Sequence, residues 1–294
     1  AYVSRHSRII SALQQTGADI LCLQEFWFEG ELRALYRHGL SGYSMFVLQR
    51  TGWNCNGPSE DGLALLVHKS RWRVLMRKDV QFSQHDIPQD RVALCLVVQR
   101  TEQPLDGEAI AIVTTHLTFP HHQYDERARQ LQIEVTVREV DLALKEWRPE
   151  MPVPIVLAGD LNGGGNDAVA NILRKAGFVR AFDEMHSREV CHTHVDHRGA
   201  MHSADHIWLF QPSRSTELQL KDATLLPRDT PDCEPLPPPT VNRSSPVTNK
   251  SSYHGDGDNG LPPPPVSFIE WCQLSDHRPM LATLCIASAG MVRE

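Results

Sequence analysis

Acidic and imidazole side chains stand at the ends of several short apolar segments of this chain. A carboxylate or a histidine at such a position can bind a metal ion, deprotonate a water molecule or stabilise a negative charge. One residue of this kind is unremarkable, but several strand ends can meet and form one site. The candidates are Glu25, His116, Asp160 with Asn162, Asp205, and Asp276 with His277.

Asp160 and Asn162 belong to a Gly-Asp-Leu-Asn sequence that follows the apolar residues 155–158. The carboxylate could orient and deprotonate a water molecule, and the carboxamide could donate a hydrogen bond to water or phosphate. The alternative is a turn rich in Asp and Asn, because three glycines follow at 163–165. Glu25 is either a solvated strand end or a ligand for Mg²⁺, which prefers oxygen donors.

The Asp276-His277 pair is the most informative of these motifs. A histidine held by a carboxylate becomes a better base, or a cation that stabilises an oxyanion. Because neighbouring residues of a strand face opposite sides, the partner of His277 is expected to be a distant acid, and Asp205 is the candidate. Asp276 is then left to bind a metal ion or to act on the nucleophile. The alternative is a chance Asp-His pair in a surface loop.

His116 ends an apolar segment and could donate a hydrogen bond to a phosphoryl oxygen. The alternative is a histidine of the core with its hydrogen bonds satisfied. Two other stretches suggest metals more weakly. The stretch 191–206 holds one cysteine and five histidines, but its spacing matches no standard zinc finger. Residues 256–260 resemble the start of an EF-hand loop, but no Glu closes a twelve-residue loop, so we interpret them as an acidic linker.

Apolar periodicity predicts a mixture of helices and strands around these residues. The predicted helices cover residues 4–16, 125–147 and 168–176. The predicted strands cover residues 18–23, 63–68, 73–75, 93–98, 109–115, 155–158, 205–210, 267–273 and 280–286. Since the polar groups gather where strands end, the pattern favours a sheet-based α/β scaffold that carries one site along an edge.

Residues 212–264 differ from the rest of the chain in composition. Pro, Ser, Thr, Asp and Asn dominate, with proline runs at 237–239 and 262–265. Such a segment buries too little apolar surface to offset the entropy lost on ordering. We therefore predict a Pro/Ser-rich disordered insertion at about 212–264.

The 294-residue chain has a formal charge of −7, which argues against a protein that coats nucleic acid through Lys and Arg. No apolar run approaches the roughly 20 residues of a membrane span. The seven cysteines include no CxxC pair, which favours a reducing compartment, and we expect an intracellular, cytoplasmic location. No signal peptide is visible, but the chain begins with Ala1 and not Met, so a targeting segment could be missing.

Five motifs resemble those of the endonuclease/exonuclease/phosphatase superfamily, and they occur in the family's order. They are Leu23-Gln24-Glu25, Thr115-His116-Leu117, Gly159-Asp160-Leu161-Asn162, Asp205-His206-Ile207-Trp208 and Ser275-Asp276-His277-Arg278-Pro279. Each motif alone is weak, whereas five in the right order are a strong signal. The stretches 115–121 and 197–209 are similar to plant and algal members of the family that often carry EF-hands.

This resemblance implies an α/β fold, a four-layer α-β-β-α sandwich of the DNase-I-like kind, formed by a single domain over residues 1–294. It also implies that Glu25 binds Mg²⁺, with Mn²⁺ as an alternative, and that Asp276 lies near this metal. We expect a monomer without a membrane span.

The resemblance further assigns roles in catalysis. Asp160 would position or deprotonate the attacking water with support from Asn162. His277, paired with Asp205, would stabilise the pentacoordinate phosphorus. His116 and Asn162 would contact the phosphoryl group of the substrate. The implied function is Mg²⁺-dependent hydrolysis of a phosphodiester or phosphomonoester by water, as a nuclease acting on RNA or DNA or as a small-molecule phosphatase.

One departure separates this chain from the family pattern. Family members open with a strand whose Asn touches the metal site, and this sequence begins at the following helix. We interpret the sequence as truncated. The alternatives are a catalytically inactive phosphate- or lipid-binding protein on the same scaffold, and a zinc protein built on the histidine-rich stretch.

Overall fold

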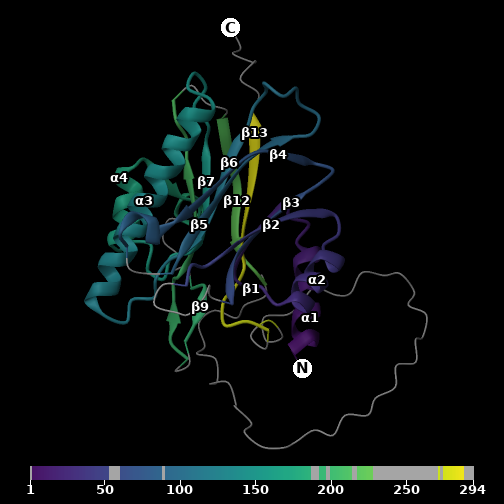
Figure 1. Ribbon diagram of the computed structural model, residues 1–294, viewed down its shortest axis with the longest axis vertical. Helices are drawn as coiled ribbons and strands as arrows, with labels where there is room; N and C mark the ends of the chain where they lie inside the picture. The colour runs from purple at the N-terminus through teal and green to yellow at the C-terminus, as the bar shows by residue number, and fades with distance from the viewer. Residues whose placement is uncertain are drawn as a thin grey trace, which may run out of the picture.

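The computed structural model describes residues 2–52, 60–87, 90–186, 192–196, 199–213, 217–227, 271 and 274–287. Two central layers of strands lie between two outer layers of helices (Figure 1). The predicted four-layer α/β fold is therefore confirmed.

A six-stranded sheet forms one of the two central layers, in the order β4-β5-β6-β7-β11-β8. Its strands are β4 (Trp72–Gln81), β5 (Val92–Arg100), β6 (Ile110–His116), β7 (Ile155–Asp160), β11 (Asp205–Phe210) and β8 (Phe178–Arg180). The pair β6 and β7 is parallel, and the other neighbouring pairs are antiparallel. The carboxyl ends of β6 and β7 therefore share one edge of the sheet with the amino ends of β5 and β11.

Helices α3 (Gln123–Trp147) and α4 (Ala168–Lys175) cover the outer face of this sheet (Figure 1). Ile133 of α3 and Leu173 of α4 pack in one core with Leu157 of β7. Both helices match the predicted ones.

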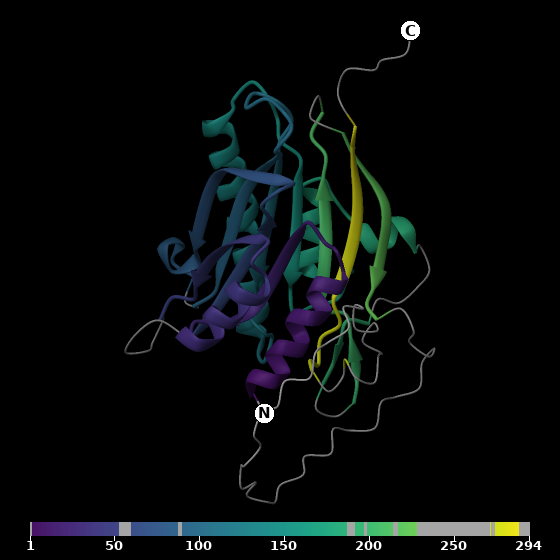
Figure 2. The ribbon, with the colours of Figure 1, turned by 90° about the vertical axis from the view of Figure 1, so that its right-hand side faces the viewer.

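Two smaller sheets pack side by side on the inner face of the six-stranded sheet (Figure 2). One has the order β1-β3-β2, and the other pairs β12 with β13. The strands are β1 (Ile20–Trp27), β2 (Tyr43–Gln49), β3 (Asp61–His68), β12 (Glu217–Leu225) and β13 (Met280–Ala287). Leu65 of β3 and Ala223 of β12 both join the core that Leu96 of β5 belongs to. Among the described strands, β1 pairs with β3 alone and β13 with β12 alone.

Helices α1 (Tyr2–Gln15) and α2 (Gly30–Gly39) complete the fourth layer. Ile10 and Leu13 of α1 and Leu32 of α2 pack against Leu21 and Leu66 of the three-stranded sheet. Shorter elements are the 3₁₀ turn η1 (Phe82–His85), the helix α5 (Ala181–Met185), and the hairpin of β9 (His194–Val195) and β10 (Met201–His202). No helix in the described part of the chain is both long enough and apolar enough to cross a bilayer.

The predicted disordered insertion at 212–264 is wrong at its beginning, because residues 217–225 form β12 and pair with β13. Leu218 and Leu220 point into the core, and an irregularity between Leu220 and Asp222 brings Ala223 to the same face. This alternation supplies apolar surface that the average composition of the segment hides. Residues 228–264 lie outside the described part, and so does most of the predicted strand 267–273.

Candidate active site

Three of the predicted site residues occupy adjacent positions at one edge of the six-stranded sheet. His116 ends β6 and pairs in register with Asp160, which ends β7, and Asp160 pairs in register with Asp205, which begins β11. Four residues earlier on β6 and β7, Ile112 and Val156 point into the core between the two central layers. Because side chains alternate along a strand, His116 and Asp160 face the same interior.

His277 reaches this edge from the segment before β13, where a β-bridge joins it to His194. The predicted pairing with Asp205 is present, since Nδ1 of His277 lies 2.8 Å from Oδ2 of Asp205. Nε2 of His277 lies 4.0 Å from Oδ2 of Asp160. Potential ligand atoms of Asp160, Asp205 and His277 all lie within 4.8 Å of one another.

Asp276 points outward from this group, with 68% of its side chain exposed. Its Oδ2 lies 3.7 Å from Nε2 of His194, and the polar interaction with this imidazole lowers the pKa of Asp276. The His194 ring stacks on that of His277 with 4.4 Å between centroids. His194, Asp276 and His277 form a second group whose potential ligand atoms lie within 4.8 Å.

Burial shapes the chemistry of Asp160 and His116. Asp160 is 5% exposed, and burial together with the charge of Asp205 raises its pKa to about 7. Nε2 of His116 lies 3.3 Å from Oδ2 of Asp160. Burial, followed by the charges of Arg91 and Arg50, lowers the pKa of His116 well below its ordinary value. His116 is therefore a neutral imidazole at pH 7.

His277 has the opposite electrostatic character. Burial acts to lower its pKa, but the hydrogen bond and charge of Asp205, with Asp160 and Asp276, outweigh burial and raise the pKa to about 9. At neutral pH the edge therefore holds an imidazolium next to a carboxyl group that titrates near neutrality. Neighbouring titratable groups whose pKa values are shifted strongly by burial and by nearby charges are typical of acid–base sites.

Asn162 ties the ends of β6 and β7 together. Its backbone N–H donates to Oδ1 of Asp160 at 2.8 Å, and its side-chain amide donates to the carbonyl of Leu117 at 2.8 Å. Its φ of 52° lies in the left-handed region, which Asn tolerates better than most residues. At Gly159, one residue before Asp160, a Cβ would lie 2.0 Å from the carbonyl oxygen of Thr115, so only glycine fits there.

Glu25 lies on the exposed rim of the same region. It has a φ of 51° and sits where the pairing of β1 is irregular, between Leu23 and Phe26. The side-chain amide of Gln24 donates to the hydroxyl of Thr114 on β6 at 2.9 Å, which holds this end of β1 against the six-stranded sheet. Glu25 belongs to neither of the two groups of potential metal ligands among the described residues.

The histidine-rich stretch does not gather around one point. His206 is buried, with Nε2 2.7 Å from the carbonyl oxygen of Gly163, and His202 faces Asp196 at 3.2 Å. In the described part of the chain, no three histidines of this stretch form a potential metal site. Cys191, His197 and residues 256–260 lie outside the described residues.

Two arginines at this edge were not predicted. Arg91 immediately precedes β5, whose Ala93 pairs with Thr115 of β6. Arg50 immediately follows β2 and forms an ion pair with Asp61, the first residue of β3. A signal was available for Arg91 alone, since this basic residue lies just before the predicted strand 93–98, whereas residues 43–49 before Arg50 were not predicted as a strand.

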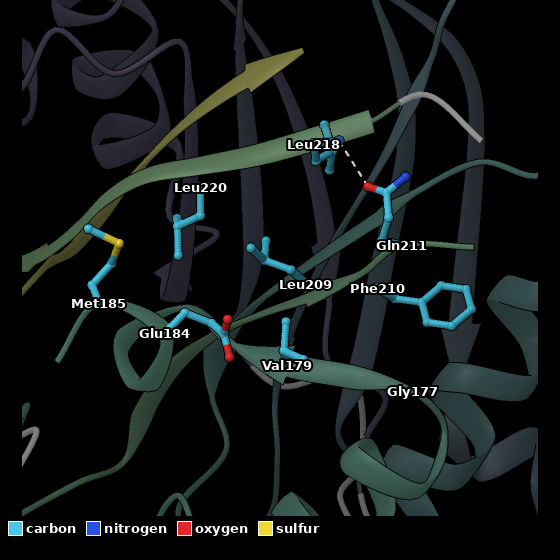
Figure 3. A pocket seen from close by; sticks show the side chains of 9 residues that line it. All are labelled: Gly177, Val179, Glu184, Met185, Leu209, Phe210, Gln211, Leu218 and Leu220. Atoms are coloured by element: carbon cyan, nitrogen blue, oxygen red, sulfur yellow. Dashed lines mark hydrogen bonds between the residues drawn. The ribbon is translucent and has the colours of Figure 1, made fainter. Parts of the chain in front are cut away.

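A groove of about 520 Å³ lies elsewhere, between β8, β11, α5 and β12 (Figure 3). Leu209 and Phe210 of β11, Val179 of β8 and Leu220 of β12 line it. Because Asp205 begins β11 and Phe210 ends it, the groove lies at the opposite edge of the sheet from the candidate site. Its lining is mostly apolar.

Comparison with known sequences identifies the family of the chain. The Endonuclease/Exonuclease/phosphatase family model matches residues 2–248. An uncharacterized calcium-binding protein of Arabidopsis thaliana is 33% identical over 228 residues, which cover 73% of this chain and 45% of that protein. Protein angel homolog 2 of Bos taurus is 29% identical over 163 residues, which cover 54% of this chain and 28% of that protein. The chain thus spans less than half the length of these curated relatives.

Solved structures share the fold. The catalytic domain of human nocturnin with a bound sulfate has a TM-score of 0.58 at 20% identity, covering 75% of this chain and 78% of that one. ANGEL2, described as a 2′,3′-cyclic phosphatase, has a TM-score of 0.55 at 19% identity, covering 72% and 74%. A Bacteroides vulgatus endonuclease/exonuclease/phosphatase has a TM-score of 0.62 at 18% identity, covering 96% and 90%. The Arabidopsis relative confirms the predicted similarity to plant proteins.

Proposed function

The chain belongs to the endonuclease/exonuclease/phosphatase family, and from that premise we propose that it is a divalent-metal-dependent phosphoesterase. The observation that carries the proposal is the group of Asp160, Asp205 and His277, with His116 3.3 Å from Asp160. Attack of water on phosphorus needs a proton acceptor, relief of negative charge at the phosphoryl oxygens and help for the leaving oxygen. These four side chains offer an acceptor and two kinds of hydrogen-bond donor.

Asp160 is the proposed group that positions and deprotonates the water. A base works best when its pKa lies near the pH at which it acts, and the pKa of Asp160 is raised to about 7. The N–H of Asn162 holds one oxygen of this carboxylate at 2.8 Å. That bond fixes the direction of the carboxylate, so Asn162 is proposed to support the base and, through the remaining amide hydrogen, to contact substrate.

His277 and His116 are the proposed donors to the phosphate. Asp205 holds His277 through Nδ1, which leaves Nε2 facing the interior near Asp160. As a cation, His277 would stabilise the charge that develops at phosphorus. His116 is neutral at pH 7 and can donate a hydrogen bond to a phosphoryl oxygen without carrying a proton away.

The residues of this region fit a divalent metal ion. Asp160 and Asp205 are two acids close enough that the charge of one raises the pKa of the other, and a cation nearby would relieve this repulsion. Oxygen-rich donors suit Mg²⁺ or Mn²⁺. Glu25 is the proposed ligand, with Asp276 near the ion. Such a metal supplies a Lewis acid that neutralises charge on the phosphoryl oxygens.

The substrate is proposed at the level of a phosphodiester or phosphomonoester. RNA, DNA and small phosphorylated molecules all qualify. Since ANGEL2 is described as a 2′,3′-cyclic phosphatase, a nucleoside 2′,3′-cyclic phosphate belongs in any test panel.

The experiment is hydrolysis of bis(p-nitrophenyl) phosphate and of a panel of phosphoesters, with Mg²⁺ and with EDTA. We expect turnover with Mg²⁺, complete loss in EDTA and recovery when Mg²⁺ or Mn²⁺ is added back. His277→Gln should lower the rate about 10²-fold or more, whereas His38→Gln, an exposed histidine on α2, should not change it. Full activity in EDTA would exclude metal dependence. Binding of inorganic phosphate without any turnover would instead support the inactive binding protein.

A further inference from the structure

Arg91 lies beside the candidate site and takes no part in the mechanism above. Antiparallel pairing places the start of β5 next to the end of β6, the strand that His116 ends. The side chain of Arg91 is 15% exposed. Its charge reaches both neighbours, because it helps to lower the pKa of His116 and opposes the rise in the pKa of Asp160.

The guanidinium of Arg91 lies near an acid but has an unsatisfied hydrogen-bond donor. Its Nε lies 3.8 Å from Oδ1 of Asp90, which is beyond hydrogen-bonding distance. Its NH1 is buried and has no hydrogen-bond partner in the described part of the chain. A buried charged donor without an acceptor is costly, so a donor in this position is suited to bind an additional acceptor such as a phosphate oxygen.

Arg50 shows the contrast. Its Nε donates to Asp61 at 2.8 Å, its NH2 also binds Asp61, and its NH1 lies 3.5 Å from Asp90. Arg50 is thus neutralised within the fold, and it anchors Asp90 next to Arg91. Of the two arginines, Arg91 is therefore the one with an N–H group available to bind a ligand.

We propose that Arg91 is a substrate-binding residue whose guanidinium donates to a non-bridging oxygen of the phosphate under attack. The inference rests on the proposed function, because it places a phosphoester at the Asp160 edge. In the sheet order β5-β6-β7-β11, Arg91 and the His277–Asp205 pair stand on opposite sides of His116 and Asp160. A phosphate there brings negative charge close to the carboxylates of Asp160 and Asp205. The cations Arg91 and His277, one on each side, offset this charge. The planar guanidinium matches the spacing of phosphate oxygens.

The test compares Arg91→Gln and Arg91→Lys with Arg100→Gln, since Arg100 ends the same strand at its other, partly exposed end. The measurements are kcat/KM for bis(p-nitrophenyl) phosphate and the inhibition constant of inorganic phosphate. We expect Arg91→Gln to lower kcat/KM about 10²-fold, as loss of an oxyanion donor typically does, and to weaken phosphate inhibition at least tenfold. Arg91→Lys should retain part of the kcat/KM and part of the phosphate inhibition, because it keeps the positive charge but loses the planar pair of N–H donors.

The outcomes separate this inference from the proposed function. If the parent chain hydrolyses the ester and Arg91→Gln matches Arg100→Gln in both measurements, the inference fails and the proposed function stands. If the parent chain hydrolyses nothing, the proposed function fails, and Arg91 is tested by the rise in melting temperature with inorganic phosphate. A rise that survives in Arg91→Gln then overturns the inference. If Arg91→Gln does not fold, Arg91→Lys takes its place, and unchanged values in it count against the guanidinium contact.

Discussion

Asp160, which ends β7, and Glu25, which lies at an irregular position near the end of β1, are carboxylates of the same region that differ in almost every physical respect. Asp160 is 5% exposed, is bonded by the N–H of Asn162, and has its pKa raised to about 7 by burial and Asp205. Glu25 is exposed, at an irregular position of β1. A buried carboxylate is suited to accept a proton, whereas an exposed one is suited to a cation that keeps several of its waters.

The comparison predicts two separable classes of variant. Changes on the buried side, which Asp160, Asp205 and His277 form, should alter the rate and its pH dependence. Changes at the Glu25 rim should alter the metal concentration that the reaction needs. A variant that moves both properties together would break the division.

The largest effect is expected from Asp160→Asn, which removes the proposed base. We expect kcat to fall about 10²–10⁴-fold. The melting temperature should not fall at pH 8, because a carboxyl whose folded pKa is raised stabilises the fold at low pH and loses that contribution as pH rises through about 7. Asn carries no charge there. Steady-state kinetics and thermal unfolding measure this, with Asp141→Asn on α3, whose half-exposed carboxylate pairs with Lys145, as the matched control. Retention of full kcat would remove Asp160 from the mechanism.

The second-largest effect is expected from Glu25→Gln, which should change the dependence of the rate on Mg²⁺. We expect the Mg²⁺ concentration for half-maximal rate to rise at least about tenfold, with much of the rate recovered at saturating Mg²⁺. A Mg²⁺ titration of the rate measures this, with Glu134→Gln on α3 as the control. An unchanged titration, or a lost rate that no Mg²⁺ concentration restores, would argue against Glu25 as a ligand.

Asp205→Asn should shift the pH profile. The rate should rise as Asp160 ionises near pH 7 and fall as His277 loses its proton near pH 9. Removal of Asp205 takes away the bond and charge that raise the pKa of His277, so the alkaline limb should move to lower pH. Loss of the same charge lowers the pKa of Asp160, so the acidic limb should also move down. The pH dependence of kcat/KM measures both limbs, and an unshifted alkaline limb would contradict the role of this pair.

The smallest effect is expected from Gln24→Ala, which removes the bond to Thr114 between the two central layers. One partly buried neutral hydrogen bond contributes about 1 kcal/mol to the free energy of unfolding. Activity should fall only several-fold, through looser placement of the adjacent Glu25. Denaturant unfolding and the Mg²⁺ titration check this, and Thr114→Val should give the same pair of changes.

The sequence predicted most of the fold because the inner strands are continuous apolar runs that end at polar residues. The runs 93–98, 109–115 and 155–158 became β5, β6 and β7, and their polar ends meet since the sheet brings these ends to one edge. Strand alternation indicated that the partner of His277 is a distant acid, and the candidate Asp205 is the residue that bonds it. Strand β12 was missed because its leucines are diluted by polar residues on the exposed face.

The side-chain geometry of the site was less accessible to sequence reasoning. Periodicity says nothing about Arg91 or Arg50, because their places depend on which strands become neighbours. Asn162 was predicted to act on water or phosphate, and the structure shows part of its amide bonded to Leu117. Similarly, nothing in the run before Glu25 signals its left-handed backbone, which depends on the irregular pairing of β1 with β3.

The glycine at position 159 has a consequence for how variants of this chain should be interpreted. Because its missing side chain lets two backbones touch at Thr115, it sets the gap across which the neighbouring imidazole and carboxylate meet. Even an alanine there would push the pair apart while every reactive group stayed in the chain. Such a protein would lose activity because the imidazole and the carboxylate stand too far apart, although both are present. A comparison of its reactive residues alone would not show the cause.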